Sequence, residues 1–240
     1  MLTLNNVCWK PDDGEAVLKG IDLKVPAGKL TVVTGPNGGG KTSLAKVIAG
    51  LNATTEGSIL LDDIDITEKD ITERARLGVS YAFQQPVRFK GVAVRDLLEL
   101  AAGGTIDEEH VCSILAKVGL CTKDYIDREV NASLSGGEIK RIEIATVLAR
   151  KNSRLLIFDE PEAGIDLWSF SGLIETFEEL KKEKDKSLLV ISHQERLLEI
   201  ADEIAVIVDG RVRIAGPGKE IMPQLMEGEK SGSCPMGREW

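Results

Sequence analysis

The sequence lacks long apolar runs and has no excess of basic residues. No segment approaches the roughly eighteen apolar residues of a membrane-spanning helix, and residues 1–10 lack the basic and apolar regions of a signal peptide. The formal net charge is −9, whereas proteins that grip nucleic acid or anionic lipid need basic patches. These absences predict a cytoplasmic protein that neither inserts into a membrane nor binds nucleic acid.

Cysteine is also scarce, and the 4 cysteines form no C-x-x-C pair and no cluster with histidine. The sequence therefore offers no metal site of that kind. Isolated thiols in a reducing compartment are commonly small buried side chains, so we expect Cys8, Cys112 and Cys121 to be buried. Cys234, near the C-terminus, is a candidate for an exposed and reactive thiol.

What is present is an alternation of apolar strands and helical patterns, without internal repeats. The expected strands lie at residues 2–9, 20–25, 30–35, 57–66, 78–83, 154–161, 186–193 and 203–210. Apolar residues recur at helical spacing from about residue 92 to 130, which indicates an inserted helical lobe. A C-terminal helix and tail are expected over residues 216–240. The order predicts an α/β fold with a parallel sheet covered on both faces.

A glycine-rich loop follows the strand at residues 30–35 and fits the pattern G-x-x-x-x-G-K-[ST]. Its glycines allow backbone N–H groups to point at phosphate oxygens, and the following helix adds a partial positive charge. We expect Lys41 to reach the β- and γ-phosphates of a nucleotide and the Thr42 hydroxyl to bind Mg²⁺. The loop expected to bind the nucleotide comprises Gly35, Pro36, Asn37, Gly38, Gly39, Gly40, Lys41, Thr42 and Ser43.

A pair of acids ends the apolar strand Leu155 to Phe158. Carboxylates at the end of a buried strand usually face a cation. We expect Asp159 to hold Mg²⁺ through water and Glu160 to polarise the attacking water. The alternative is an acidic strand end that caps the next helix, which is common for one acid and much less so for a pair in a chain that also has the glycine-rich loop.

A second glycine-containing loop, Leu-Ser-Gly-Gly-Glu at residues 134–138, precedes another helical pattern. Ser135 and the N–H groups of Gly136 and Gly137 would lie at a helix N-terminus, which makes a second anion site. One nucleotide cannot readily use two such sites of one compact chain.

The order of these motifs over residues 1–215 resembles the ATP-binding cassette (ABC) ATPases. The resemblance implies a P-loop NTPase fold with a RecA-like core, an antiparallel β subdomain and a helical subdomain inserted at about residues 90–148. It implies two cassettes that face each other head to tail as a transient, ATP-dependent homodimer. ATP would then lie between Lys41 and Glu160 of one copy and Ser135 and Gly137 of the other.

The resemblance also assigns roles to three further positions. Residues 164–166 (Gly-Ile-Asp) match the D-loop of the family, and His193 matches the switch histidine near the γ-phosphate. Gln84 matches the Q-loop residue that touches Mg²⁺ or the attacking water, with Gln85 as the next-best register. A lone histidine or glutamine would carry little information without the other motifs.

Several features narrow the resemblance. The position of the adenine-stacking aromatic falls on Pro11, and Trp9 is expected to point to the core. Glu138 stands where transporter cassettes mostly have glutamine. The stretches 82–87, 90–98, 127–144 and 192–212 resemble the SufC family of ATPases. That resemblance implies a SufB/SufD-like scaffold as partner in iron–sulfur cluster assembly, with the cluster chemistry on the scaffold.

Two rival functions stay open. The chain could be the ATP-binding subunit of a membrane ABC transporter, held to its partner through the groove beside the Q-loop. A nucleic-acid-associated cassette is disfavoured by the negative charge and by the single cassette. Asp62, Asp63 and Asp65 look like a metal cluster, but in a cassette they are expected to flank a turn of the antiparallel sheet.

Overall fold

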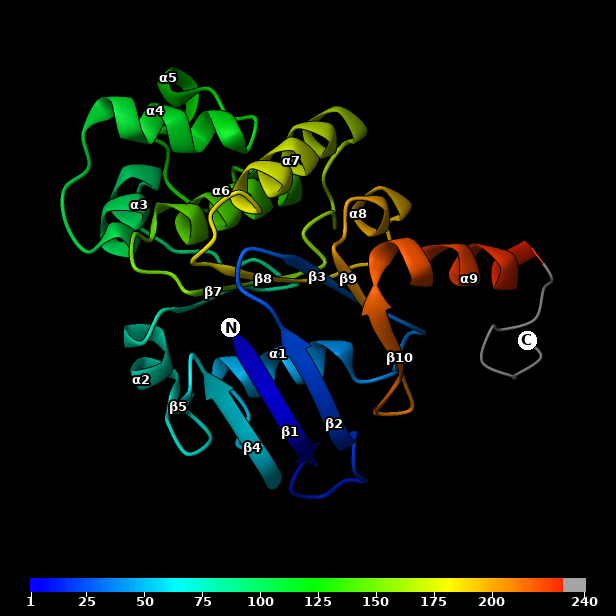
Figure 1. The fold of residues 1–240 in the computed structure, drawn as a ribbon. Helices are drawn as coiled ribbons and strands as arrows, with labels where there is room; N and C mark the ends of the chain where they lie inside the picture. Colours follow the sequence, from blue (N-terminus) through cyan, green and yellow to red (C-terminus); the bar gives the residue numbers. More distant parts are fainter. Residues whose placement is uncertain (231–240) are drawn as a thin grey trace.

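The computed structural model describes residues 1–230 and places two sheets below a layer of helices (Figure 1). Over these residues the larger sheet has the strand order β10-β9-β3-β8-β7-β6. Its strands are β3 (Leu30–Thr34), β6 (Val79–Ala82), β7 (Leu155–Asp159), β8 (Ser187–Ile191), β9 (Glu203–Val208) and β10 (Arg211–Pro217). Cys234 lies outside the described residues.

Strands β9, β3, β8, β7 and β6 run parallel to one another. Every residue of β3, β7 and β8 is buried, because both faces of the sheet are covered. The expected parallel sheet is therefore confirmed. The edge strand β10 was not predicted; it pairs antiparallel with β9. Its residues alternate between exposed and half-buried, so residues 211–217 lack the continuous apolar run that marks the inner strands.

The smaller sheet is antiparallel, with the order β2-β1-β4-β5. Its strands are β1 (Leu2–Trp9), β2 (Leu18–Val25), β4 (Glu56–Leu61) and β5 (Ile64–Asp65). The turn between β4 and β5 holds Asp62 and Asp63 at φ of 47° and 67°, and Asp62 pairs with Arg154 and with the N-terminal ammonium. These residues are turn residues, as expected, and no cluster of three possible metal ligands occurs within residues 1–230.

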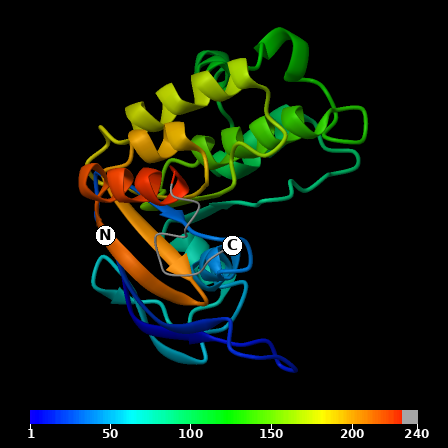
Figure 2. The same cartoon turned by 90° about the vertical axis from the view of Figure 1, so that its right-hand side faces the viewer.

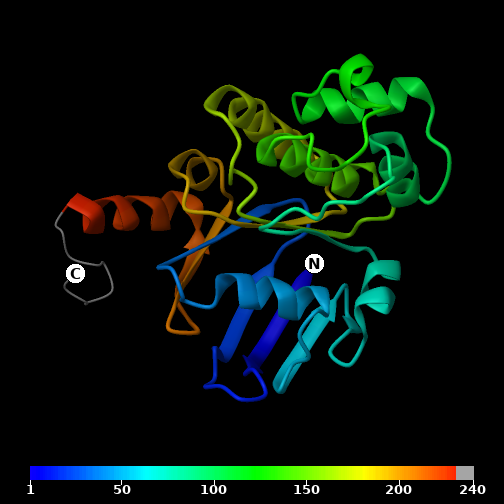
Figure 3. The same cartoon turned by 180° about the vertical axis from the view of Figure 1, so that it is seen from behind.

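Helix α1 (Lys41–Ala49) lies between the two sheets (Figure 3). Side chains of the central sheet alternate between two cores, as the period of a strand requires. Val33, Ile157 and Leu189 join the lower core with α1, whereas Phe158 and Val190 join the upper core under the helices. The helices on the two sides of the sheet thus contribute to separate cores.

The upper layer contains most of the helices (Figure 2). They are α3 (Val94–Ala102), α4 (Glu108–Lys117), α5 (Thr122–Tyr125), α6 (Gly136–Ala149) and α7 (Leu167–Leu180). Phe177 of α7 meets Phe158 of β7 edge to face, with ring centroids 5.0 Å apart. The expected C-terminal helix is α9 (Gly218–Lys230), which packs beside α8 (Glu195–Glu199), and α2 (Ile71–Arg76) precedes β6. Within residues 1–230 no helix combines the length and apolar character that crossing a bilayer requires.

The prediction that Cys8, Cys112 and Cys121 are buried is wrong, since none of the three is fully buried. Cys112 and Cys121 are exposed, and Cys8 is half-buried. Val111, Ile114 and Leu115 form the buried face of α4, so Cys112 falls on the outer face of that helix. Cys121 precedes the short helix α5 at the surface.

Candidate functional site

The glycine-rich loop between β3 and α1 depends on backbone shapes that only glycine adopts easily. Gly35, Gly38 and Gly40 have φ of 132°, 78° and 102°. A Cβ at Gly35 would lie 2.1 Å from the carbonyl oxygen of Ile207, whereas Gly38 faces open space. No side chain caps the N-terminus of α1. Its first N–H groups are therefore left for an anion.

Lys41 is buried inside this loop, with 6% of its surface exposed. Its ammonium donates to the carbonyl oxygens of Gly35 (2.8 Å) and Pro36 (3.0 Å). Burial lowers the pKa of Lys41, against the charges of Glu160 and Asp159. The ammonium is thus held beside the loop by bonds that a phosphate could replace.

Asp159 is completely buried at the end of β7 and accepts two hydroxyl hydrogen bonds. Thr42 Oγ1 donates to one carboxylate oxygen at 3.2 Å and Tyr81 Oη to the other at 2.9 Å. Burial raises the pKa of Asp159, and these two hydrogen bonds oppose the shift. A carboxylate beside a hydroxyl is the oxygen donor set that Mg²⁺ prefers, so Thr42 and Asp159 fit the predicted metal.

Tyr81 was missed by the sequence analysis. Burial and the neighbouring Asp159 raise its pKa, so it stays a hydroxyl donor. No local motif marks it. It reaches Asp159 because β6 pairs with β7, with Tyr81 opposite Ile157.

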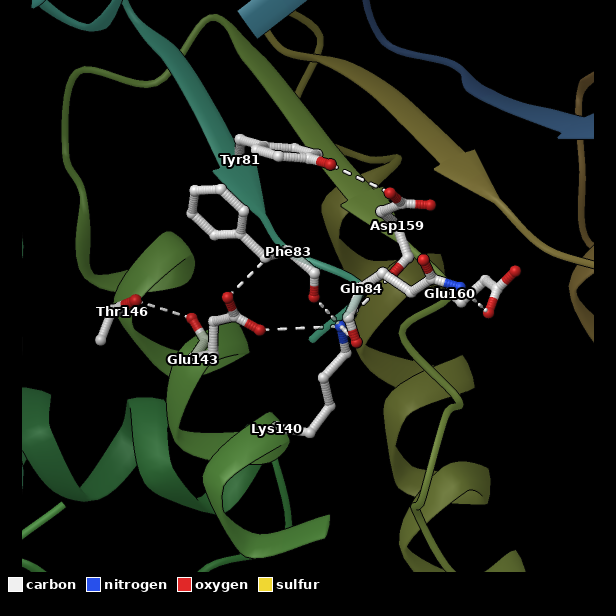
Figure 4. Close-up of polar contacts among 8 residues, drawn as sticks. All are labelled: Tyr81, Phe83, Gln84, Lys140, Glu143, Thr146, Asp159 and Glu160. Atoms are coloured by element: carbon white, nitrogen blue, oxygen red, sulfur yellow. Dashed lines mark hydrogen bonds and ion pairs between the residues drawn. The ribbon is translucent and has the colours of Figure 1, made fainter. Parts of the chain in front are cut away.

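Glu160 follows Asp159 with φ of 46°, a left-handed backbone shape that is uncommon outside glycine. Its N–H donates to the carbonyl oxygen of Ile191 (3.0 Å). Gln84, the favoured of the two glutamine registers, donates from Nε2 to a Glu160 carboxylate oxygen at 2.8 Å (Figure 4). The loop after β6 and the end of β7 therefore meet through these two side chains.

His193 follows β8, so it lies at the carboxyl ends of the parallel strands, as Glu160 does. Its Nδ1 is 3.5 Å from Thr34 Oγ1, and partial burial together with the charge of Lys41 lowers its pKa. The preceding Ser192 donates to Glu162 at 2.6 Å. Burial raises the pKa of Glu162, a residue that the sequence analysis also missed because its partner is distant in the chain.

The second glycine-containing loop, which we call the signature loop (residues 134–138), forms the start of α6. Ser135 is the N-cap: its Oγ accepts from the N–H of Glu138 at 3.2 Å, and its own N–H donates to the Glu138 carboxylate at 2.7 Å. Tyr125 donates to the same carboxylate, and Arg128 lies 3.6 Å from it. The Tyr125 hydrogen bond, then the Ser135 N–H, lowers the pKa of Glu138 to about 2.

The signature loop touches the predicted D-loop of the same chain. A Cβ on Gly137 would lie 2.4 Å from the carbonyl oxygen of Gly164. By contrast, α6 and α1 contribute to the cores on opposite faces of the central sheet. The structure thus gathers part of the predicted site at the carboxyl ends of the parallel strands. Ser135 and Gly137 lie apart from it, in the helical layer. The gathered residues are Lys41, Thr42, Gln84, Asp159, Glu160 and His193.

Comparison with known proteins gives a consistent answer. The sequence model of the ABC transporter family matches residues 18–163. The uncharacterized ABC transporter ATP-binding protein MJ0035 of Methanocaldococcus jannaschii is 41% identical over 213 residues, covering 85% of this chain and 84% of the relative. The probable ATP-dependent transporter ycf16 of Cyanophora paradoxa is 35% identical over 228 residues, covering 89% and 87%.

Among solved structures, a nucleotide-free ATP-binding cassette from an ABC transporter superposes with a TM-score of 0.82 at 26% identity, covering 99% of both chains. The mixed parallel sheet, the separate antiparallel sheet and the helical layer make up the P-loop NTPase fold that the resemblance implied. The chain belongs to the ABC transporter family, as an ABC ATPase domain with the P-loop NTPase fold.

Proposed function

We propose that this chain hydrolyses Mg²⁺-bound ATP and that closure of two copies moves a SufB/SufD-like scaffold in iron–sulfur cluster assembly. The observation that carries the hydrolytic part is the contact of Gln84 with Glu160, at the sheet edge where Lys41, Thr42 and Asp159 also lie. A carboxylate held by an amide beside the glycine-rich loop is what a general base for ATP hydrolysis requires, and this supports the proposal.

Each residue has a distinct role in the proposed reaction. Backbone N–H groups of residues 35–43, apart from Pro36, which has none, would bind the phosphates, and Lys41 would exchange its two loop carbonyls for β- and γ-oxygens. Thr42 and Asp159, with Gln84, would hold Mg²⁺, which neutralises charge on the phosphate oxygens when bound.

Glu160 would accept a proton from water as the water oxygen bonds to the γ-phosphorus and the bond to the bridging oxygen breaks. His193 would donate a hydrogen bond to an oxygen of the γ-phosphate.

The proposed homodimer rests on the position of the signature loop. Because α6 and α1 belong to cores on opposite faces of the sheet, Ser135 and Gly137 would complete a nucleotide site only on a second copy. Copies of charge −9 repel each other, so association would depend on bound nucleotide.

The first experiment is Glu160→Gln. We expect ATP binding to persist and turnover to fall at least about a hundredfold, because the amide cannot accept the proton. Light scattering after gel filtration with ATP is expected to show a trapped dimer. Glu178→Gln, on the exposed face of α7, is the matched control. A Glu160→Gln protein that hydrolyses ATP at the normal rate would contradict the role of Glu160.

The scaffold partner is supported by Glu138 and by the four stretches that resemble the SufC family. A second candidate is the ATP-binding subunit of a membrane ABC transporter, which the names of the two relatives favour. Affinity purification of the tagged chain from its native cells, with mass spectrometry, separates them. A SufB-like protein would support the scaffold, and only membrane-spanning proteins would support the transporter.

Two further expectations stay predictions. They are the cytoplasmic location and the division into one ATPase domain (1–215) and a C-terminal helix and tail (216–240). Trp9 packs against the lower core, as expected for a residue that does not stack on adenine.

A further inference from the structure

Lys140, in the second turn of α6 just after the signature loop, is a completely buried cation with no role assigned above. Its ammonium donates to the carbonyl oxygens of Phe83, Asp159 (3.1 Å) and Gln84 (3.4 Å) (Figure 4). Three donors thus meet three backbone acceptors. Burying a lysine is costly unless it is fully paired, so this arrangement fixes the three carbonyls in space.

Glu143, one turn further along α6, completes the cluster. One carboxylate oxygen accepts from the N–H of Phe83 at 2.9 Å, and the other lies 3.6 Å from the Lys140 ammonium. Burial raises the pKa of Glu143, and the charge of Lys140 opposes this shift. Thr146 Oγ1 donates to the Glu143 carbonyl oxygen at 2.7 Å. Both the N–H and the C=O of Phe83 are therefore held by side chains of one helix.

The groups held by this pair are next to the reacting groups. Phe83 directly precedes Gln84, and Asp159 directly precedes Glu160, so the pair fixes the backbone from which the Gln84 and Glu160 side chains project. The same helix begins at the signature loop, so a shift of α6 would move residues 83–84 and residue 159 with it.

We propose that Lys140 and Glu143 are positioning residues. They hold the backbone of residues 83–84 and 159 so that the Gln84 and Glu160 side chains keep their relative positions, and they connect this backbone to the helix that begins at the signature loop. The inference rests on the proposed ATP hydrolysis. It assigns no contact with ATP to either residue.

The first test is Lys140→Met, which keeps the length of the side chain and removes its donors. We expect kcat to fall about tenfold or more, because small misplacements of reacting groups are costly. The KM for ATP is expected to stay within about threefold, since the glycine-rich loop between β3 and α1 is untouched. Lys140→Arg should recover part of kcat. The control is Lys117→Met. Lys117 lies on α4 and forms an exposed ion pair with Glu179 of α7.

A double variant separates positioning from stability. Replacing a buried ion pair with apolar residues often restores stability. We expect Lys140→Met/Glu143→Leu to regain the melting temperature lost by Lys140→Met while kcat stays low. If kcat recovers together with the melting temperature, or if Lys140→Met leaves kcat unchanged, the proposal is wrong.

Amide hydrogen exchange provides a readout that does not depend on activity. In Glu143→Leu, which removes the acceptor of the Phe83 N–H, exchange at residues 83–84 should accelerate at least about tenfold relative to the sheet core. Unchanged exchange there would overturn the proposal. A wild-type chain that hydrolyses no ATP would refute the proposed function, whereas the exchange result would still test the positioning pair.

Discussion

Helices α1 and α6 both follow glycine-containing loops, yet only α6 has its first N–H groups capped by side chains. At α1 no side chain caps the helix, and the Lys41 ammonium is bonded to the carbonyl oxygen of Gly35 in the preceding loop. At α6 a capping box joins Ser135 and Glu138 and brings a carboxylate to the first turn. One local pattern, glycines before a helix, thus leaves the first N–H groups without a side-chain cap at α1 and capped by the chain's own side chains at α6.

The difference has an electrostatic consequence. The carboxylate of Glu138, kept ionised by Tyr125 and the Ser135 N–H, offsets part of the positive end of α6. The N-terminus of α1 has no acid in its first turn. We therefore expect the α1 loop to bind phosphate more strongly than the signature loop of the same copy, which would contribute only when a second copy brings a phosphate to it.

The largest effect is expected from breaking the α1 site. Lys41→Met removes the ammonium beside the P-loop, so ATP turnover should fall at least about a hundredfold and ATP binding should weaken. Phosphate release and equilibrium nucleotide binding are the measurements. Lys46→Met, in the last turn of the same helix, is the control. Normal turnover in Lys41→Met would show that the α1 loop is not the phosphate site.

A smaller effect is expected at α6, and it depends on pH. Because folding lowers the pKa of Glu138 to about 2, its ionised form stabilises the protein fully above the unfolded pKa. That stability is lost as the pH falls from about 5 toward 2. Glu138→Gln should cost about 1–2 kcal/mol at pH 7 and less at pH 3, measured by urea unfolding. An equal loss of unfolding free energy at both pH values would mean that the negative charge of Glu138 does not stabilise the N-cap of α6.

The smallest effect is expected from the other half of the capping box. Ser135→Ala should cost about 1 kcal/mol of unfolding free energy, because the Glu138 N–H loses its acceptor while the Ser135 N–H keeps its own. Ser133→Ala, two residues upstream on the exposed loop, is the control. A cost equal to that of the control would show that the cap is formed by Glu138 alone.

Local sequence was enough for the elements whose cause is local. The five parallel strands follow from continuous apolar runs, and α1 follows from a glycine loop and a helical pattern. Strand β10 was missed because Arg211 and Arg213 interrupt its apolar pattern and its pairing is an edge contact with β9. The exposed Cys112 shows that the burial of a lone residue depends on which face of a helix it occupies.

The glycine-rich loop, the acidic end of β7 and the signature loop can be predicted from the sequence, because each is a short run with its own backbone chemistry. Which of these runs lie together depends on the packing of the folded chain. Tyr81 meets Asp159, and Glu162 meets Ser192, across strands or loops that are distant in the chain. In the sequence, Lys140 and Glu143 look like an i,i+3 pair on a helix surface. Sheet packing buries them against the Q-loop, and burial is the physical reason that their charges must bind specific backbone groups.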